Sequence, residues 1–313
     1  MNVTLRTRVG GLELPNPVVT AAGCAGAGRE LAQFFDIASL GAVTTKSVML
    51  EPHAGRPAPR MAETPSGMLS TTGMQGPGLD VLLQRDLPWL LSRGGRAIVS
   101  LAGAGVAEFG ELAHRLSEAE GIGAIEVNLS CPDPESAAGR TFADDPARAG
   151  EVVGTVRSRA GAQLPVLAKL AGDVPDIVES ATACSEAGAD GLSMINTLRG
   201  MVVDTRTLRP AVAGGLGGLS GPAVRPIAVG CVHRVHEALP EVPIIGMGGV
   251  RTGEDVLEFM AAGASAVGVG TVNFSDPSAG ARVLREFTEA LEERGFARAA
   301  DLVGAAHRTG PRG

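Results

Sequence analysis

A strand, a glycine-rich turn and the start of a helix follow one another in Pro243-Ile244-Ile245-Gly246-Met247-Gly248-Gly249-Val250-Arg251-Thr252. The apolar run Pro243–Gly246 has the length of a buried strand, and Thr252 is a suitable N-cap for a helix over Gly253–Ala262. A second apolar run, Ala266–Val269, comes shortly after that helix. Because neighbouring parallel strands need a crossover connection, usually a helix, this stretch predicts a βαβ unit.

Similar units recur along the whole chain. The predicted strands are Pro17–Ala21, Ala42–Thr45, Ala97–Leu101, Ala124–Leu129, Pro165–Leu170, Gly191–Ile195, Pro243–Gly246 and Ala266–Val269. Segments with helical spacing between them include Ala107–Glu120, Ala147–Ala160, Ile177–Ala187, Ala223–Leu239 and Gly253–Ala262. Strands that alternate with helices in a chain of 313 residues predict an α/β fold, a (β/α)8 TIM barrel formed by residues 1–313 as a single domain.

The segments outside these units are expected to be additions to the barrel. Thr4–Val9 and Leu12–Leu14 predict a small N-terminal β-hairpin that plugs one end. The Gly/Pro-rich stretches Glu51–Gly78 and Ala211–Pro222 are predicted as long βα loops, because no low-complexity linker divides the chain. One barrel therefore fits the sequence better than two domains.

The composition argues against several classes of protein. The net charge is −7, and aromatic residues make up 3% with no tyrosine, so the basic face and stacking rings of nucleic-acid binders are missing. No apolar run approaches the ~20 residues of a membrane-spanning helix. The first residues lack the layout of a secretory signal, so a cytoplasmic protein is expected. The four cysteines form no C-x-x-C pair, and we expect neither a disulfide framework nor a metal site.

The scarcest polar residues lie at the carboxyl ends of predicted strands. The chain has only two lysines: Lys46 follows the second strand and Lys169 ends the fifth. Two of its five asparagines also lie at strand ends: Asn128 ends the fourth strand, and Asn196, with Thr197, follows the sixth. In (β/α)8 barrels this rim carries the active site. The pattern therefore predicts an active site there.

Three glycine groups lie where such barrels often hold a phosphate, next to the last two strands. They are Gly246-Met247-Gly248-Gly249, Gly268-Val269-Gly270-Thr271 and Gly217-Gly218-Leu219-Ser220-Gly221. Glycine allows the backbone N–H groups to approach an anion closely, because it has no side chain to block them. We expect a phosphorylated ligand or cofactor.

The rim residues leave more than one chemistry open. A strand-end lysine can form a Schiff base, stabilise an anion or hold a flavin ring. The neighbouring amides, hydroxyls and single thiol suit a planar ligand with mixed hydrogen-bond donors and acceptors. Cys131, in Asn128-Leu129-Ser130-Cys131-Pro132, can accept a proton if its pKa is tuned toward neutrality. A Schiff-base lyase using Lys46 or Lys169 and a non-catalytic barrel that binds FMN or a phosphorylated metabolite are the alternatives.

Longer motifs connect the chain to a known family. They are Ala21-Ala22-Gly23-Cys24, Thr45-Lys46-Ser47, Glu63-Thr64-Pro65-Ser66-Gly67-Met68-Leu69, Asn128–Pro132, Met194-Ile195-Asn196-Thr197, Gly218–Pro222 and Ile245–Val250. In these motifs the chain resembles class 1 dihydroorotate dehydrogenases, most closely the catalytic subunit of class 1B. The resemblance implies a barrel that holds FMN and oxidises dihydroorotate to orotate in pyrimidine biosynthesis. Class 2 enzymes use a serine base, where this chain has Cys131.

The resemblance also implies roles for individual residues. Cys131 is expected to be the general base that takes a proton from the ring carbon, while a hydride leaves the adjacent carbon for the flavin. Lys46 is expected beside the flavin and the substrate carboxylate, and Lys169 beside the N1 and C2-oxygen end of the flavin. The implied FMN contacts are Ala22, Gly23, Lys46, Ser47, Ser100, Asn128, Lys169, Gly221, Gly248, Gly249, Gly270 and Thr271. The implied substrate contacts are Lys46, Ser70, Thr72, Gly73, Met74, Asn128, Asp133, Asn196 and Thr197.

The chain departs from the family pattern at three positions. Ser70 and Asp133 stand where the family normally has substrate-binding asparagines, and Ala22 replaces a usual serine near the flavin. An ionised aspartate only accepts hydrogen bonds, whereas asparagine also donates them. Asp133 at the substrate is therefore expected to favour a ring with additional N–H groups or positive charge. Two interpretations follow: the same flavin chemistry on a different dihydro-ring, or an ordinary dihydroorotate dehydrogenase with a tolerant pocket.

The resemblance bears on partners as well. Class 1B enzymes work with a second subunit that carries FAD and a [2Fe–2S] cluster, and this chain has no cysteine spacing for a cluster of its own. Class 1A enzymes are homodimers that use a soluble acceptor such as fumarate. We expect a small carboxylated ring as substrate, a homodimer and a separate electron-transfer subunit.

Overall fold

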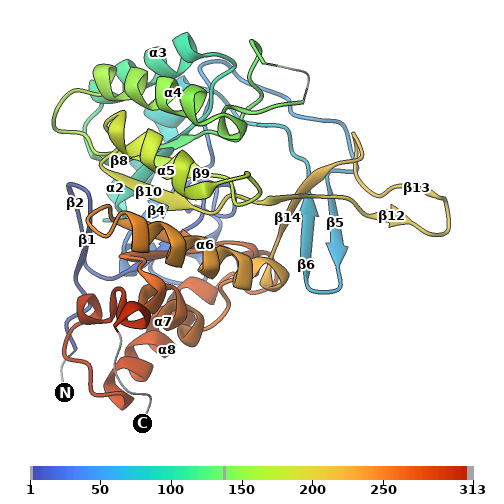
Figure 1. The fold of residues 1–313 in the computed structure, drawn as a ribbon. Coiled ribbons are helices and arrows are strands. Elements are labelled where there is room, and N and C mark those ends of the chain that lie inside the picture. Colours follow the sequence, from blue (N-terminus) through green and yellow to red (C-terminus); the bar gives the residue numbers. More distant parts are fainter. Residues whose placement is uncertain (1–2, 137–138, 309–313) are drawn as a thin grey trace.

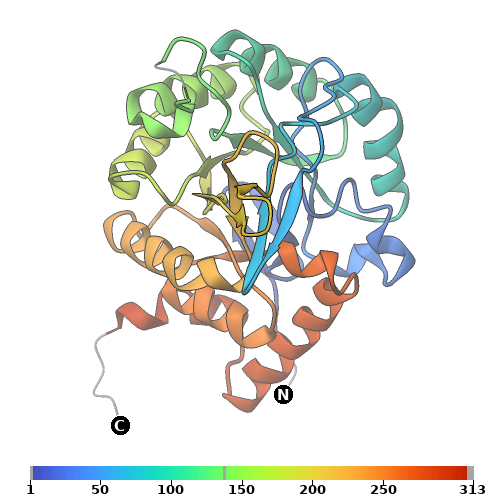
Figure 2. The same cartoon turned by 90° about the vertical axis from the view of Figure 1, so that its right-hand side faces the viewer.

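The computed structural model describes residues 3–136 and 139–308. Its main sheet has eight parallel strands, in the order β3 (Val18–Thr20), β16 (Ala266–Val269), β15 (Ile244–Met247), β10 (Gly191–Met194), β9 (Val166–Leu170), β8 (Ile122–Asn128), β7 (Ala97–Leu101) and β4 (Val43–Thr44). A bridge between Val19 and Ala42 joins the two edge strands, so the sheet closes into a barrel (Figure 2). The predicted (β/α)8 TIM-barrel fold is confirmed.

Helices surround the barrel, as Figure 2 shows. They are α1 (Leu79–Val81), α2 (Leu87–Ser92), α3 (Val106–Ser117), α4 (Pro146–Arg159), α5 (Ile177–Glu186), α6 (Arg225–Ala238), α7 (Gly253–Ala262) and α8 (Ala279–Glu293). Helix α7 has the predicted bounds and the predicted N-cap, because the Thr252 hydroxyl accepts a hydrogen bond from the Asp255 amide at 3.4 Å. No helix in the described part of the chain is long and apolar enough to cross a membrane.

The N-terminal hairpin closes the amino end of the barrel, as the sequence predicts. Strands β1 (Thr7–Val9) and β2 (Leu12–Leu14) pair in antiparallel fashion. Their buried side chains pack into one cluster with apolar residues from inside the barrel. This cluster consists of Val9, Leu12, Leu14, Val19, Ala42, Ile98, Ala124, Leu167, Ile245, Met247 and Ala266.

The barrel interior changes from apolar to polar toward the carboxyl ends of the strands. Residues two positions apart on a strand point to the same face, so Ser100 follows Ile98 inward and Lys169 follows Leu167. Strand register places Ser100 beside Glu126 and Ser193 beside Lys169. We call Ser100, Glu126, Lys169 and Ser193 the polar layer; all four are buried. It separates the apolar plug from the mouth of the barrel.

A small antiparallel sheet over the barrel mouth was not predicted. It consists of β5 (Met61–Thr64), β6 (Gly67–Ser70), β14 (Gly217–Ser220) and β11 (Leu198–Gly200), and it projects from the barrel together with the hairpin β12 (Val203–Asp204)–β13 (Arg209–Pro210) (Figure 1). The two stretches expected to be long βα loops contribute to it. Glycine and proline obscured the strand pattern, and the pairing of β6 with β14 joins segments far apart in sequence.

Candidate active site

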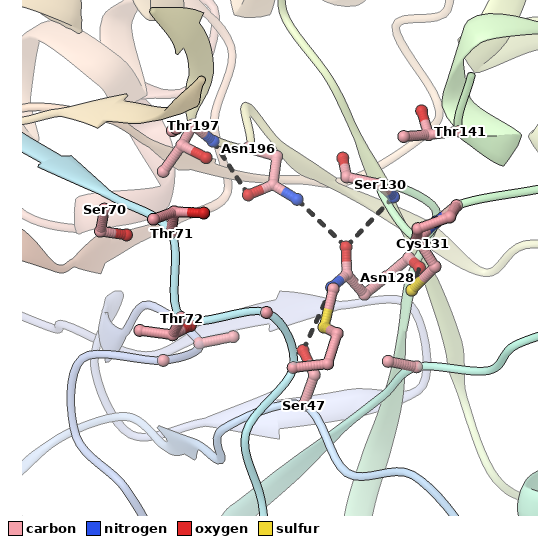
Figure 3. Close-up of a pocket in the computed structure, with 18 of the residues that line it drawn as sticks. Ser47, Ser70, Thr71, Thr72, Asn128, Ser130, Cys131, Thr141, Asn196 and Thr197 are labelled. Carbon is pink, nitrogen blue, oxygen red and sulfur yellow. Dashed lines mark hydrogen bonds between the residues drawn. The ribbon is translucent and has the colours of Figure 1, made fainter. Parts of the chain in front are cut away.

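A cavity of about 1030 Å³ opens at the carboxyl ends of the barrel strands, beneath the antiparallel sheet. Predicted residues from many parts of the chain line it: Ala22, Gly23, Lys46, Ser47, Ser70, Thr72, Gly73, Met74, Asn128, Cys131, Lys169, Asn196 and Thr197. Figure 3 shows Ser70, Thr71 and Thr72 on one side of the cavity and Cys131 with Thr141 on the other. The two predicted asparagines lie between these groups.

Asn128 is the centre of a hydrogen-bonded chain across the floor of the cavity (Figure 3). Its Oδ1 accepts hydrogen bonds from the Ser130 amide at 3.2 Å and from Asn196 Nδ2 at 3.1 Å. Its Nδ2 donates to Ser47 Oγ at 3.3 Å. The Asn196 Oδ1 in turn accepts from the Thr197 amide at 2.9 Å. The chain fixes both side-chain amides before any ligand binds, which lowers the entropy cost of binding.

The chain of hydrogen bonds continues into the barrel. Ser47 Oγ lies 2.8 Å from Ser100 Oγ. Ser100 is fully buried behind Ser47 and does not line the cavity, although the sequence predicts it as a cofactor contact. It supports Ser47 from the polar layer.

Cys131 lies in the loop after β8, with 1% of its surface exposed. Its Sγ donates a hydrogen bond to the Asn128 carbonyl oxygen at 3.1 Å. Burial raises the pKa of the thiol to about 12, a hydrogen bond from the Gly103 backbone lowers it, and the Glu108 carboxylate adds a smaller upward shift. This is the opposite of the expected shift toward neutrality, because the site excludes water and no cation offsets the loss of solvation.

The two lysines differ in their surroundings. Lys46 is half-buried in the cavity wall, and burial, with the nearby Arg60, lowers its pKa. Within the described residues it forms no ion pair, so its charge is available to a ligand. Lys169 is buried, and its Nζ lies 3.3 Å from Glu126 Oε1. Both lysines line the cavity: Lys169 lies near the carboxyl end of β9, and Lys46 follows β4, three strands away in the barrel.

Among the predicted phosphate-binding glycine groups, Gly217 and Gly218 line the cavity, whereas Gly221, Gly248, Gly249 and Gly270 lie outside its lining, at the ends of β14, β15 and β16. Gly221 and Gly249 have φ values of 97° and 78°, which favour glycine. They also touch: a Cβ on Gly249 would lie 2.7 Å from the Gly221 oxygen, and one on Gly221 would lie 2.6 Å from Gly67 Cα. Gly248, Gly270 and Thr271 belong to the same turns. Close backbone packing therefore requires glycine here whether or not a phosphate binds.

Asp133 is the predicted substrate contact that the structure does not bring to the cavity. Its side chain is 1% exposed and makes a two-point ion pair with Arg148 of α4: Nε lies 2.9 Å from Oδ2 and Nη2 lies 3.0 Å from Oδ1. The Oδ1 also accepts a hydrogen bond from the Glu135 amide at 3.1 Å. Asp133 lies outside the cavity lining and is paired with Arg148, so it gives no reason to expect a cationic or amino-substituted substrate.

Three features of the site were not predicted. Glu126 could have been found, because a charged residue within the apolar strand pattern Ile125-Glu126-Val127 indicates a buried ionisable group. Thr141 enters the cavity from a loop that has no distinctive pattern. Arg199 is held at the rim by Asp144 and Asp173 at 2.9 Å each, an arrangement that depends on the tertiary fold.

Comparisons with known proteins agree with this geometry. The sequence model of the family described as dihydroorotate dehydrogenase matches residues 4–291. A protein of Desulforudis audaxviator named "Dihydroorotate dehydrogenase B (NAD(+)), catalytic subunit" is 48% identical over 310 residues, covering 99% of this chain and 100% of the relative. A protein of Geobacillus kaustophilus with the same name is 45% identical over 306 residues, covering 98% and 96%.

Proposed function

The chain belongs to the dihydroorotate dehydrogenase family, and on that premise we propose that it oxidises dihydroorotate to orotate with FMN as the hydride acceptor. It is an oxidoreductase that acts on a CH–CH bond, and the family is flavin-dependent. One observation carries the proposal for the site: the cavity brings a buried thiol, a fixed chain of amides and two lysines together at the strand ends. These groups match a reaction that removes a proton and a hydride from adjacent carbons.

The residues present fit an FMN molecule. Ligand sites commonly have volumes of ~300–1,000 Å³, and the cavity of about 1030 Å³ has room for a cofactor beside a small ring. At Gly23, where φ is 85°, an added Cβ would meet no atom within 4 Å, so the backbone borders open space.

FMN, when bound, supplies the ring that accepts the hydride. Cys131 takes the proton from the neighbouring carbon and holds it on Sγ. A thiol whose pKa is about 12 is a strong base once it has lost its proton, and its burial keeps competing water away. The same burial keeps Cys131 protonated at neutral pH, so the thiol first releases its proton to solvent, and the proton taken from the ring carbon then re-forms the thiol.

The remaining polar groups bind and orient the substrate. Lys46 is placed to pair with the carboxylate of the ring, since its charge has no acidic partner within the described residues. The side chains of Asn128, Asn196 and Thr197 supply donors and acceptors for ring N–H and C=O groups. Ser70 and Thr72 face them from the antiparallel sheet and the loop after it.

The proposal includes a partner subunit. The names of the two relatives describe a catalytic subunit of an NAD(+) enzyme. We propose that a separate subunit carrying FAD and a [2Fe–2S] cluster accepts the electrons, and that the chain forms a homodimer in the cytoplasm. A Schiff-base lyase is not favoured: Lys169 is paired with Glu126, and the family carries out redox chemistry.

Two measurements test the function. The cofactor released from purified protein is identified by chromatography, and orotate formation is followed with an artificial electron acceptor. We expect FMN, and orotate formed in step with acceptor reduction. A colourless protein that borohydride traps covalently on a carbonyl substrate would instead support lyase chemistry.

A further inference from the structure

Glu126 and Lys169 form a buried ion pair directly beneath the cavity. Their side chains are 1% and 5% exposed, and Lys169 Nζ lies 3.3 Å from Glu126 Oε1. Lys169 lines the cavity and Glu126 does not, so the lysine lies between the carboxylate and any ligand. The other two members of the polar layer, Ser100 and Ser193, carry no charge.

The pair is incompletely satisfied. Glu126 Oε2 has no hydrogen-bond partner in the part of the chain that the structure describes. An unpaired oxygen on a buried charge costs folding free energy, and a single contact recovers only part of it. Apolar residues of matching volume often replace such a pair without loss of stability. Stability therefore does not explain why a carboxylate lies here.

The effect of the Glu126 carboxylate on the charge of Lys169 explains its presence better than stability does. A reduced flavin carries negative charge on the ring, and the Lys169 ammonium favours that state. A carboxylate at 3.3 Å from the ammonium offsets part of this effect, because the two charges are close and the barrel interior has a low dielectric constant. We propose that Glu126 is a positioning residue that holds Lys169 toward the cofactor and keeps the reduction potential of the flavin lower than Lys169 alone would set it.

This inference rests on the proposed function, because it needs a bound flavin. The test compares the reduction potential of the bound FMN in wild type, Glu126→Gln and Ser193→Ala by equilibration with a reference dye. We expect Glu126→Gln to shift the equilibrium toward reduced flavin by at least about tenfold, which is ~30 mV for a two-electron couple. Ser193→Ala removes an uncharged member of the same layer and should leave the potential unchanged.

The lysine background shows whether Glu126 acts through Lys169. Lys169→Met removes the ammonium through which Glu126 is proposed to act, so in that background the further change Glu126→Gln should alter the flavin equilibrium by less than about twofold. An equal shift in both backgrounds, or no shift in Glu126→Gln alone, would overturn the proposal. Protein that binds no flavin in any of these forms would contradict the proposed function itself.

A second measurement applies if the Glu126→Gln variant loses its flavin. If Glu126→Gln binds FMN too weakly for a potential titration, the affinities of the apoprotein for oxidised and reduced FMN give the same quantity by linkage. Their ratio should change by at least about tenfold in favour of the reduced form. A parallel loss of both affinities would assign Glu126 a purely structural role.

Discussion

Two acid–base pairs involve carboxylates that are close together in the sequence: Glu126, within β8, pairs with Lys169, and Asp133, in the loop after β8, pairs with Arg148. Asp133 and Arg148 form a two-point pair at 2.9 and 3.0 Å, and the Glu135 amide also donates to Asp133. Glu126 and Lys169 have one contact at 3.3 Å, and one carboxylate oxygen has no partner within the described residues. The first pair lies outside the cavity lining, and the second contributes Lys169 to it.

The difference shows what each pair is for. Both carboxylate oxygens of Asp133 accept hydrogen bonds within the protein, and the pair with Arg148 anchors the loop after β8 to α4. The pair in the barrel keeps unused donors on Lys169, and these face the cavity. The Asp133–Arg148 pair therefore has a structural role, whereas the Glu126–Lys169 pair belongs to the proposed active site. Unusual ionisable groups often cluster at functional sites.

The largest effect is expected at Cys131, which lies on the loop that the scaffold pair anchors. Cys131→Ala should lower the rate of flavin reduction by dihydroorotate by roughly 10²–10⁴-fold, because a general base contributes about that much. Cys184→Ala in α5 is the matched control: burial raises the pKa of that thiol to about 12 as well, but it does not line the cavity. Equal rates in the two variants would show that Cys131 is not the base.

The pH dependence follows from the same pKa. Burial raises the pKa of Cys131 to about 12, so the thiolate fraction grows with pH throughout the range in which the protein is handled. The rate of flavin reduction should rise about tenfold per pH unit wherever thiol deprotonation limits it. A stopped-flow series across that range in wild type and Cys131→Ser checks it. A flat wild-type profile would mean that ligand binding supplies the thiolate in another way.

Lys169→Met should have the next largest effect. Removal of the cation leaves the reduced flavin without its charge partner, and loss of one such electrostatic group typically costs ~10²–10³-fold in rate. Anaerobic stopped-flow reduction by dihydroorotate measures the rate. If Lys169→Met reduced its flavin at the wild-type rate, the Glu126–Lys169 pair would have no greater role in the reaction than the Asp133–Arg148 pair.

Breaking the scaffold pair should affect stability more than chemistry. Arg148→Met leaves Asp133 buried without its partner and should lower the melting temperature by a few degrees. The exposed pair Arg298–Asp301 provides the control, and Arg298→Met should leave the melting temperature unchanged. Thermal unfolding followed by circular dichroism compares them. An unchanged melting temperature in Arg148→Met would show that this pair anchors nothing.

The stability that this pair contributes should disappear in acid. The hydrogen bonds from Arg148 hold the pKa of Asp133 below its usual value. A carboxyl group with a lowered pKa in the folded state stabilises the protein above its unfolded pKa of about 3.9 and loses that effect as pH falls. The difference in melting temperature between wild type and Arg148→Met should therefore be largest near neutral pH and shrink below about pH 4.

The smallest effect is expected at Ser70 and Asp133, two of the three departures from the family pattern. Ser70 lines the cavity and Asp133 does not. Ser70→Asn adds an amide that can reach the substrate and should lower KM for dihydroorotate by up to about tenfold, the value of one good hydrogen bond. Asp133→Asn should leave KM within about twofold. Steady-state kinetics of the two single variants tests this, and a larger effect at Asp133 would restore it as a substrate contact.

The sequence predicted the parts of the molecule that follow local rules. The strands alternate with amphipathic helices, so the barrel was predicted in advance, and the rare polar residues at the strand ends form part of the cavity lining. The Thr252 cap is a local signal of the same kind.

Features that depend on distant contacts were missed or misplaced. The Asp133 side chain does not line the cavity, because it is paired with Arg148 on α4, the next helix along the chain. The sheet over the mouth needs β6 and β14 to meet, and neither has a recognisable strand pattern alone. The pKa of Cys131 depends on its burial, which sequence position does not reveal.

The most direct test of dihydroorotate oxidation is the absorbance of the bound flavin near ~450 nm, which falls when the flavin is reduced. Dihydroorotate is added without oxygen to the wild type and to the Ser70→Asn/Asp133→Asn variant. We predict rapid bleaching of the wild-type flavin with stoichiometric formation of orotate, because Cys131, Asn128 and Lys169 all line the cavity. A wild-type flavin that stays oxidised while the double variant bleaches would contradict the proposal, and would show that this cavity has been adapted to another ring.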